Sequence, residues 1–443
     1  MVTARAAAAR LARLGPGVLA IGLLGGCSLV TDSFVTNEFS GDPFPTMVDT
    51  STGAVFVGVR KGGSDDRVGI LDILAPLTLL DPGLESDGSI APARITTGDL
   101  TMLGKQGNGE LDLPRALLDS KAVVSLHPCA AEPCTVGPAG TDLPFRAVIG
   151  ADALAGDALR LRLGDDQIVV LPDIGGTDLD RTYECDALFP APFRGGGTLL
   201  VEGTAVPYGG RRVAMQACLG ANPSTAVVQA ERGTDLLTVV STGLGVSLLG
   251  TSAYERYRLA TPGAPDLATL PDEIVMLASG PISGHRVTVP NLALVGDSGS
   301  TPRGPCRQVY AHHLLAERDC KLTAPDRDDC PCTAGNRFCA VPAVVEVEPT
   351  AGVDFLVVAD DNQTLLALRT ELRPDQPEVD AILGTSALRS LEVDIDYPHN
   401  RVLARCSGPG CITRPALNEA GKRARVNLCI AEDTPPADPG AVN

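Results

Sequence analysis

The sequence predicts a mostly β protein built from two similar lobes. Short apolar runs alternate with clusters of Gly, Pro, Asp and Asn along most of the chain, which is typical of strands joined by turns. Segments in residues 69–154 recur in residues 238–388, so one strand-loop-strand plan occurs twice. The chain has 443 residues, which is too long for one small core and sufficient for two.

Composition and charge limit the class of protein. Hydrophobic residues make up 44% of the chain and charged residues 20%, which excludes a disordered or collagen-like protein. The formal net charge is −18, whereas a protein that tracks nucleic-acid phosphates needs a positive charge. We therefore expect no nucleic-acid partner.

The N-terminus is typical of an exported bacterial protein. Three arginines precede an apolar run over residues 14–24, which is too short to span a bilayer. The following Gly25, Gly26 and Cys27 complete a segment that resembles the lipobox of bacterial lipoproteins, in which the cysteine is lipidated and becomes the new N-terminus. The resemblance implies a signal peptide at residues 1–26. The alternative is a soluble secreted protein in which Cys27 is a further disulfide partner.

The segment after the lipobox predicts how the protein is attached. Residues 27–45 are polar without a periodic pattern, so we expect the lipidated Cys27 and a tether there. Ser28 favours the outer membrane of the bacterial cell envelope over the inner membrane, by resemblance to proteobacterial lipoproteins. The expected partner is therefore the membrane itself, through the lipid, with the body on the periplasmic or the surface face.

Cysteine usage agrees with export. Of thirteen cysteines, twelve remain after Cys27, and an even number in an exported chain indicates disulfides. Cys129 and Cys134 enclose a Pro-containing loop, and Cys406 and Cys411 enclose one with Pro and Gly, so each pair is predicted to bridge locally. The sequence does not pair the other eight, which are Cys185, Cys218, Cys306, Cys320, Cys330, Cys332, Cys339 and Cys429.

Zinc is the alternative use of the cysteine-rich region. Residues 306–339 hold five cysteines, with His312 and His313 nearby. Cys330 and Cys332 are separated by a single Pro, which is not the spacing of a zinc knuckle, and adjacent histidines point apart on a strand. We therefore expect no metal. The sequence has no Gly-rich phosphate loop between a strand and a helix, so we expect no nucleotide cofactor either.

Two pairs of segments carry the internal repeat. Residues 69–80 align without a gap on residues 238–249, and residues 147–154 align on residues 381–388. Each member of the second pair contains an apolar-apolar-Gly sequence and is followed by an alternating strand. Two copies of this plan imply two lobes.

The repeated segments resemble parts of the pepsin-like and retropepsin-like aspartic peptidases. Residues 69–80 and 238–249 look like the two Asp-Thr-Gly loops, and the glycines of the second pair, Gly150 and Gly384, look like those that cross beneath these loops. The resemblance implies a two-lobed acid-protease β-barrel fold. Its lobes would be residues 46–195 and residues 196–443, the second with a Cys-rich insertion at 306–339.

The resemblance places the catalytic pair at Asp72 and Ser241, and the sequence departs from the family there. Hydrolysis by this fold needs two carboxylates, one from each lobe, which share a proton and activate a water. The first loop keeps Asp72, but Ile73 and Leu74 replace the usual Thr and Gly. A serine hydroxyl at position 241 cannot replace the second acid-base group.

The second loop keeps the supporting residues of the family. Thr242 and Gly243 match the Thr and Gly that let the two loops approach, with the Thr hydroxyl supporting the partner loop. Another register would use Asp49 as the first aspartate, but the residues after it read as the first strand of a hairpin. A Ser-His-Asp site with one of the remaining histidines has no nucleophile elbow to support it. Those histidines are His127, His285 and His399.

These observations indicate a monomeric, membrane-anchored envelope protein whose aspartic-peptidase-like fold has lost catalysis. We expect a peptide or another envelope protein to bind in the cleft between the lobes. Two alternatives stay open: an active aspartic endopeptidase that uses Asp72 and a second carboxylate elsewhere, and a structural envelope protein with an unused cleft.

Replacing Cys27 tests the anchor. We expect Cys27→Ser to abolish membrane attachment and to leave the fold intact, because the tether contributes no core residues. Palmitate labelling and membrane sedimentation measure the effect, with the wild-type protein as control. Labelling that persists in the variant would contradict the lipobox interpretation.

Overall fold

The computed structural model describes residues 43–414 with gaps, of which the longest are 82–93, 172–186, 221–232 and 310–343. All described residues belong to one compact unit, Phe39–Asn443. Several predictions fall outside the described residues: the signal peptide, Cys27, most of the tether, Asp49, Cys129, Cys185, Cys320, Cys330, Cys332, Cys339, Cys429, His127, His312, His313 and His399.

Strands dominate the described residues, so the mostly β prediction is confirmed. The first sheet has the strand order β6-β9-β5-β12-β4-β3-β7-β8, with β2 beside β3. These strands are β2 (Met47–Val48), β3 (Val55–Lys61), β4 (Arg67–Leu71), β5 (Leu79–Leu80), β6 (Arg94–Thr96), β7 (Leu100–Lys105), β8 (Leu111–Leu118), β9 (Val123–Ser125) and β12 (Ala147–Ile149).

The second sheet has the order β11-β10-β21-β22-β25-β20-β26-β19-β18-β23-β24-β29. These strands are β10 (Thr135–Pro138), β11 (Leu143–Pro144), β18 (Ala214–Leu219), β19 (Thr234–Val240), β20 (Ser247–Gly250), β21 (Asp272–Leu277), β22 (Gly280–Val289), β23 (Leu292–Val295), β24 (Val344–Val347), β25 (Val353–Val358), β26 (Ala381–Leu383) and β29 (Cys411–Arg414).

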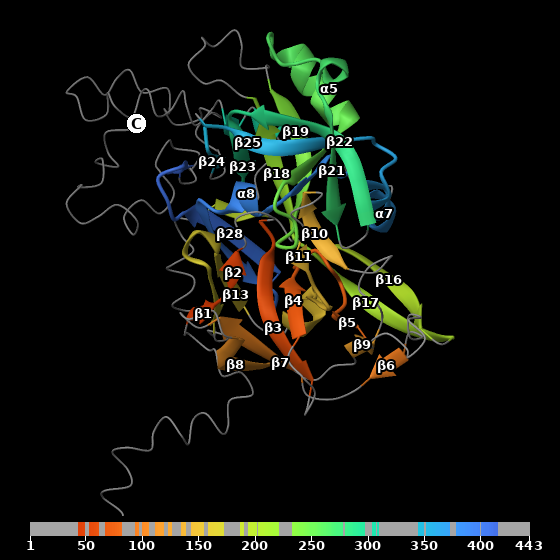
Figure 1. Ribbon diagram of the computed structural model, residues 1–443. Coiled ribbons are helices and arrows are strands. Elements are labelled where there is room, and N and C mark those ends of the chain that lie inside the picture. The colour runs from red at the N-terminus through yellow and green to blue at the C-terminus, as the bar shows by residue number, and fades with distance from the viewer. Residues whose placement is uncertain are drawn as a thin grey trace, which may run out of the picture. The chain divides into compact units, whose positions relative to one another are not determined.

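A third sheet contains strands from both halves of the chain, in the order β1-β14-β13-β27-β28-β15. In Figure 1, strands β3, β4 and β7 and strands β22, β23 and β25 lie on opposite sides of β28. The third-sheet strands are β1 (Pro43–Pro45), β13 (Ala158–Arg162), β14 (Gln167–Leu171), β15 (Ala187–Phe189), β27 (Leu391–Asp396) and β28 (Arg401–Cys406).

A separate hairpin and a few helices complete the described fold. The hairpin pairs β16 (Arg194–Val201) with β17 (Thr204–Arg212). The helices are α3 (Ala151–Leu154), α5 (Thr251–Ala260), α7 (Gln363–Leu372) and α8 (Thr385–Leu388), with single 3-10 turns at Leu163–Asp165 and Leu267–Thr269. None of these helices is long and apolar enough to cross a membrane.

The predicted repeat is confirmed by strand register. β12 lies between β4 and β5, parallel to the first and antiparallel to the second, and β26 lies in the same way between β19 and β20. Ala147 pairs with Gly69, and Ala381 pairs with Thr238, as the gapless alignment requires. A one-residue slip would turn every side chain to the other face, so this agreement fixes the duplication residue by residue.

Gly150 and Gly384 occupy equivalent crowded positions beneath the two loops. A Cβ on Gly150 would lie 2.5 Å from the carbonyl oxygen of Leu77, and one on Gly384 would lie 2.7 Å from that of Val246. The loop backbones therefore leave no room for a side chain at either position. The two repeats therefore share the same crowding at the equivalent position.

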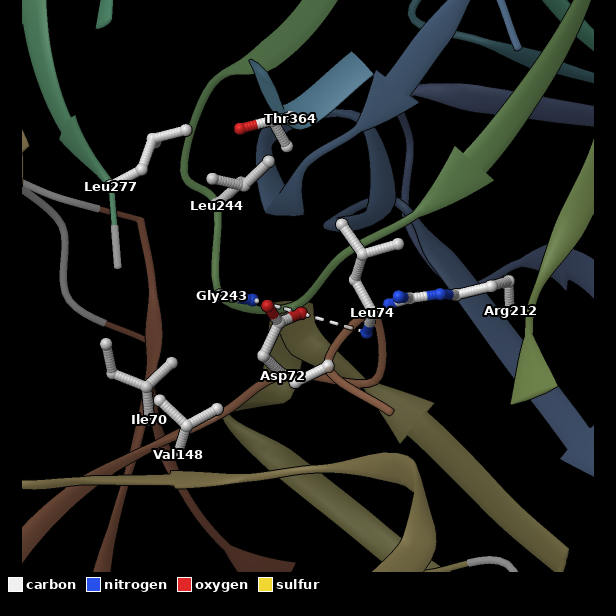
Figure 2. Close-up of a pocket in the computed structure, with 10 residues that line it drawn as sticks. Ile70, Asp72, Leu74, Val148, Arg212, Gly243, Leu244, Leu277 and Thr364 are labelled. Atoms are coloured by element: carbon white, nitrogen blue, oxygen red, sulfur yellow. Dashed lines mark hydrogen bonds between the residues drawn. The ribbon is translucent and has the colours of Figure 1, made fainter. Parts of the chain in front are cut away.

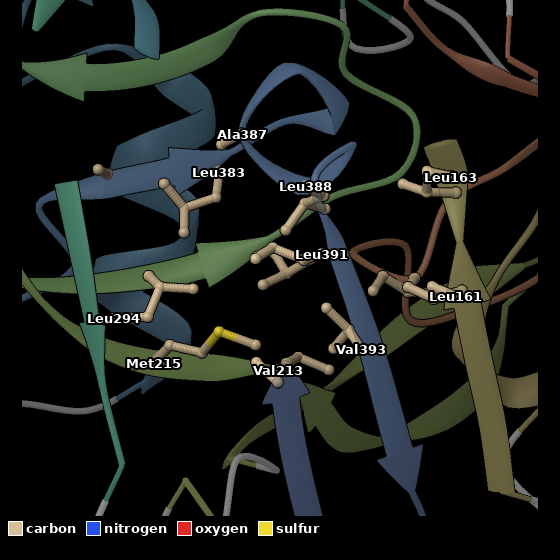
Figure 3. Packing of buried hydrophobic residues seen from close by; sticks show 14 of the residues in the cluster. Leu161, Leu163, Val213, Met215, Leu294, Leu383, Ala387, Leu388, Leu391 and Val393 are labelled. Atoms are coloured by element: carbon tan, nitrogen blue, oxygen red, sulfur yellow. The ribbon is translucent and has the colours of Figure 1, made fainter. Parts of the chain in front are cut away.

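The main core joins the third sheet to the second. Val393 of β27 packs among the same buried cluster as Leu161 of β13 and Met215 of β18 (Figure 3). The opposite side chains of β27 are acidic and buried, and they are paired with arginines; Arg160 Nε lies 2.7 Å from Asp394 Oδ1. Burial of apolar area on one face and ion pairing on the other hold this sheet between the two repeats.

Disulfides occur in the described residues. Cys406–Cys411 is present, as the sequence predicts. Cys134 is disulfide-bonded too. Cys218–Cys306 joins residues that the sequence left unpaired and lies among buried apolar residues of the second sheet.

Three details of the fold go beyond the sequence predictions. β1 lies inside the predicted tether of residues 27–45, and pairs with β14, so the folded part begins earlier than predicted. β10, from the first half of the chain, pairs with β21 of the second sheet. The predicted lobe boundary between residues 195 and 196 falls inside β16, and the lobe boundaries stay a prediction.

A substitution at Gly384 tests the equivalence of the repeats. We expect Gly384→Ala to cost about 1–3 kcal/mol of stability, because the new Cβ meets loop carbonyl oxygens. Thermal melting measures the loss, with Gly209→Ala as the matched control, since a Cβ there would lie 3.8 Å from its nearest neighbour. Unchanged melting in both Gly384→Ala and Gly150→Ala would contradict the packing.

Candidate functional site

The site lies where the loops after β4 and β19 meet. The backbone N–H of Asp72 donates to the Ile149 carbonyl at 3.0 Å, and the N–H of Ser241 donates to the Leu383 carbonyl at 2.9 Å. β12 in the first repeat and β26 in the second thus hold the first residue of each loop by a backbone hydrogen bond. The structure brings the two positions that the resemblance implicated into direct contact.

Asp72 is the acceptor at the centre of this contact. Its Oδ1 accepts hydrogen bonds from Ser241 Oγ at 2.8 Å, from the Leu74 N–H at 3.0 Å and from the Gly243 N–H at 3.3 Å. Among the described residues, none donates to Oδ2. Asp72 therefore has one oxygen fixed by both loops and one that is not engaged.

Burial raises the pKa of Asp72 above its ordinary value of 3.8. Removal from water is the largest influence, because it disfavours the charged form. The three hydrogen bonds and the positive charge of Arg212 lower the pKa and only partly offset the burial. The fold therefore makes ionisation of this carboxyl group less favourable than it is in water.

Thr242 connects the loops from one side only. Its hydroxyl donates to the Leu71 carbonyl at 2.6 Å and accepts from the Ile73 N–H at 3.2 Å. The equivalent side chain in the first loop is Ile73, which is fully buried in the main apolar core and has no hydroxyl to return these bonds. Hydrogen bonds from a threonine hydroxyl therefore cross between the loops in one direction only, and Ile73 contributes apolar packing instead.

Leu74 and Gly243 are equivalent positions with different side chains. A Cβ on Gly243 would lie 2.8 Å from the Asp72 carboxyl carbon, so only glycine fits beside an aspartate. By the same repeat, we expect the side chain of Leu74 to crowd position 241, where the short Ser241 fits and an aspartate would not. Leu74 packs with the buried apolar cluster of the second sheet.

A pocket of about 170 Å³ opens beside Asp72. Figure 2 shows Leu244, Leu277 and Thr364 on one side and Ile70 and Val148 on the other. The remaining lining residues are Asp72, Leu74, Ala75, Arg212 and Gly243. The pocket is mainly apolar, and its charged groups are one carboxyl and one guanidinium.

Arg212 is the functional candidate that sequence reasoning missed. It ends β17, and its guanidinium points toward Leu74 in Figure 2. Its Nε and Nη2 donate to the carboxylate of Glu371 on α7, at 3.2 and 2.7 Å. Glu371 lies 159 residues away along the chain, and no local motif surrounds either residue, so no sequence signal predicts the pair.

The other predicted site residues that the structure describes do not line this pocket, apart from those named above. Gly150 and Gly384 lie beneath the loops, as described above. His285 is partly exposed, and its Nδ1 lies 3.2 Å from the Pro271 carbonyl oxygen. Within the described residues, no three His, Cys, Asp or Glu side chains are grouped to hold a metal ion.

Comparison with known proteins gives solved structures at low identity and no match in sequence. No family model and no curated protein matches the sequence. The chain is similar to the solved structure of the aspartic proteinase from Irpex lacteus, with 12% identity, a TM-score of 0.35, and coverage of 86% of this chain and 99% of that one. It is similar to Basic 7S globulin from soybean, with 12% identity, a TM-score of 0.33, and coverage of 83% and 95%.

The chain has a mostly β fold in which one arrangement of strands and loops occurs twice. Its own duplicated registers establish the architecture. What the site does follows from its residues.

Asp72→Asn tests the environment of the carboxyl group. A raised pKa means that the stability this group contributes is present below pH 3.8 and is lost as the pH rises through the folded-state pKa. We therefore expect Asp72→Asn to melt at a higher temperature than the wild type at pH 7, with the difference shrinking toward pH 3.5. Asp354→Asn, at a side chain that is 46% exposed, serves as control. A variant less stable than the wild type at pH 7 would contradict the raised pKa.

Proposed function

We propose that this chain is a bacterial envelope lipoprotein that binds a peptide segment beside Asp72 without cleaving it. The observation that carries the proposal is the contact between Asp72 and Ser241, in which a serine hydroxyl stands where hydrolysis needs a second carboxylate. The duplicated loops resemble those of an aspartic-peptidase site, here with a single acidic group.

The chemistry of the pair argues against hydrolysis. An aspartic peptidase needs one ionised and one protonated carboxyl group, which activate water and protonate the leaving group. Ser241 donates its hydroxyl proton to Asp72 Oδ1 and has no accessible second protonation state near neutral pH. The pair therefore has one titrating group where the reaction needs two.

The pocket supports binding. Its walls are mainly apolar and come from both repeats, so a ligand there would contact residues of both. Small-molecule and peptide sites are commonly apolar hollows with a few placed polar groups. Asp72, Arg212 and Thr364 supply such groups here. A segment of another envelope protein is the ligand we propose.

The lipobox at Cys27 supports attachment to the bacterial envelope, with the outer membrane favoured by Ser28. Disulfides such as Cys218–Cys306 fit an oxidising compartment. The negative charge of the chain argues against nucleic acid as a partner. We propose a monomer on the periplasmic or the surface face of the membrane.

Incubation with a broad peptide library between pH 3 and 7 tests the proposal. We expect the library to remain intact and a subset of peptides to be retained by the protein uncut. Asp72→Ala is run in parallel with Asp354→Ala as control, because Asp354 does not line the pocket and its side chain is 46% exposed. Cleavage that is blocked by pepstatin and lost only in Asp72→Ala would establish the endopeptidase alternative. Retention of no peptide would favour a structural role.

Rebuilding the catalytic pair should need several changes at once. We expect Ser241→Asp alone to remain inactive, because Leu74 crowds the new carboxylate and Ile73 offers no hydroxyl to the second loop. Only Ser241→Asp with Ile73→Thr and Leu74→Gly should hydrolyse peptides, since groups that act as a unit are strongly non-additive. The same library assay measures turnover. Activity in Ser241→Asp alone would contradict the role given to Leu74.

A further inference from the structure

We infer that the pocket recognises a carboxylate on an apolar group, and that Arg212 binds it. This inference rests on the proposed function and narrows its ligand. The carboxylate could be the C-terminus of a peptide or an acidic side chain, which share the same chemistry. The guanidinium of Arg212 is the group that distinguishes this pocket from a purely apolar hollow.

Arg212 is held ready for a ligand. It is 8% exposed, and the carboxylate of Glu371 fixes its Nε and Nη2. Among the described residues, no acceptor is hydrogen-bonded to Nη1, although Arg212 lines the pocket beside Asp72. A guanidinium has five N–H donors, and Glu371 occupies only two of them, so donors of Arg212 are left for a ligand in the pocket that it lines.

A carboxylate is the acceptor that fits best. Hydrogen bonds between a guanidinium and a carboxylate are charge-assisted and stronger than those to a neutral amide. Arg212 would lose little side-chain conformational entropy on binding a ligand, because Glu371 already fixes its guanidinium group. The apolar walls formed by Ile70, Val148 and Leu277 would cover an apolar group next to the carboxylate.

Asp72 opposes the same ligand when it is ionised. Its negative charge would repel a ligand carboxylate, whereas its protonated form would add a donor through the unengaged Oδ2. Within the described part of the chain, the charged or titratable groups that act on Asp72 are Arg212 and the buried Tyr397, with Arg211 acting on Tyr397 and Glu371 paired with Arg212. We therefore expect Asp72→Asn to bind the carboxylate more tightly than the wild type at pH 7.

Paired peptide pools test the ligand with the wild-type protein. Octapeptides ending in Leu, Val, Ile or Phe are offered as free acids, as C-terminal amides, and as amides with Glu or Asp at each position. We expect binding of the free acids, or of the acidic amides, at least tenfold tighter than binding of the neutral amides. The preferred arm identifies the source of the carboxylate.

The outcomes separate this inference from the proposed function. Equal affinity in all three arms would overturn the inference and leave peptide binding intact. Retention of no peptide in any arm would overturn both. Since the comparison uses one folded protein and changes only the ligand, instability of a variant cannot obscure it.

Variants test the assignment to Arg212. Arg212→Gln with Glu371→Gln removes both buried charges, and we expect the preference for the carboxylate to fall at least tenfold. Arg286→Gln with Glu273→Gln is the matched control, because it removes a bidentate Arg–Glu pair that does not line the pocket. Binding and melting are measured together. An unchanged preference in the folded Arg212 double variant, or a weaker preference in Asp72→Asn, would overturn the assignment.

Discussion

The contact between the loops after β4 and β19 is the constraint on which the rest of the structure depends. Strands β4 and β19 come from different halves of the chain and must end close together. Thr242 is hydrogen-bonded to Leu71 and Ile73, and Ser241 is hydrogen-bonded to Asp72. This approach requires glycine beneath each loop, because carbonyl oxygens fill the space of a side chain at Gly150 and Gly384. It also requires glycine at position 243, against the Asp72 carboxyl group.

The two halves meet this constraint with different chemistry. The second loop uses a buried hydroxyl and a glycine, whereas the first uses Ile73 and Leu74, which bury apolar side chains on both sides of the contact. Apolar burial stabilises the junction but supplies no hydroxyl. Asp72 is left as a single buried acid with Arg212 nearby, and the proposal of binding without hydrolysis rests on this arrangement.

The sequence predicted those features that are repeated or local. A gapless alignment was sufficient to place β4, β5, β19 and β20. Side chains alternate between the two faces of a strand, so a shift of one residue in the pairing would expose the apolar core residues. The bridge between Cys406 and Cys411 followed from a short Pro- and Gly-containing loop. The side of the site formed by Arg212 and Glu371 could not be predicted, because a pairing across 159 residues depends on how β17 and α7 pack. The pairing of β10 with β21 is non-local in the same way.

A carbon-13 NMR titration of the aspartate carboxyl groups tests the central claim most directly, with Asp72→Asn used to assign the resonance. The structure predicts one site resonance that titrates in a single step, with a midpoint above the ordinary value of 3.8, because one buried acid faces a serine. A two-step curve would show a second carboxyl group coupled to Asp72, as in an active dyad. Either that curve or a midpoint at or below 3.8 would contradict the account.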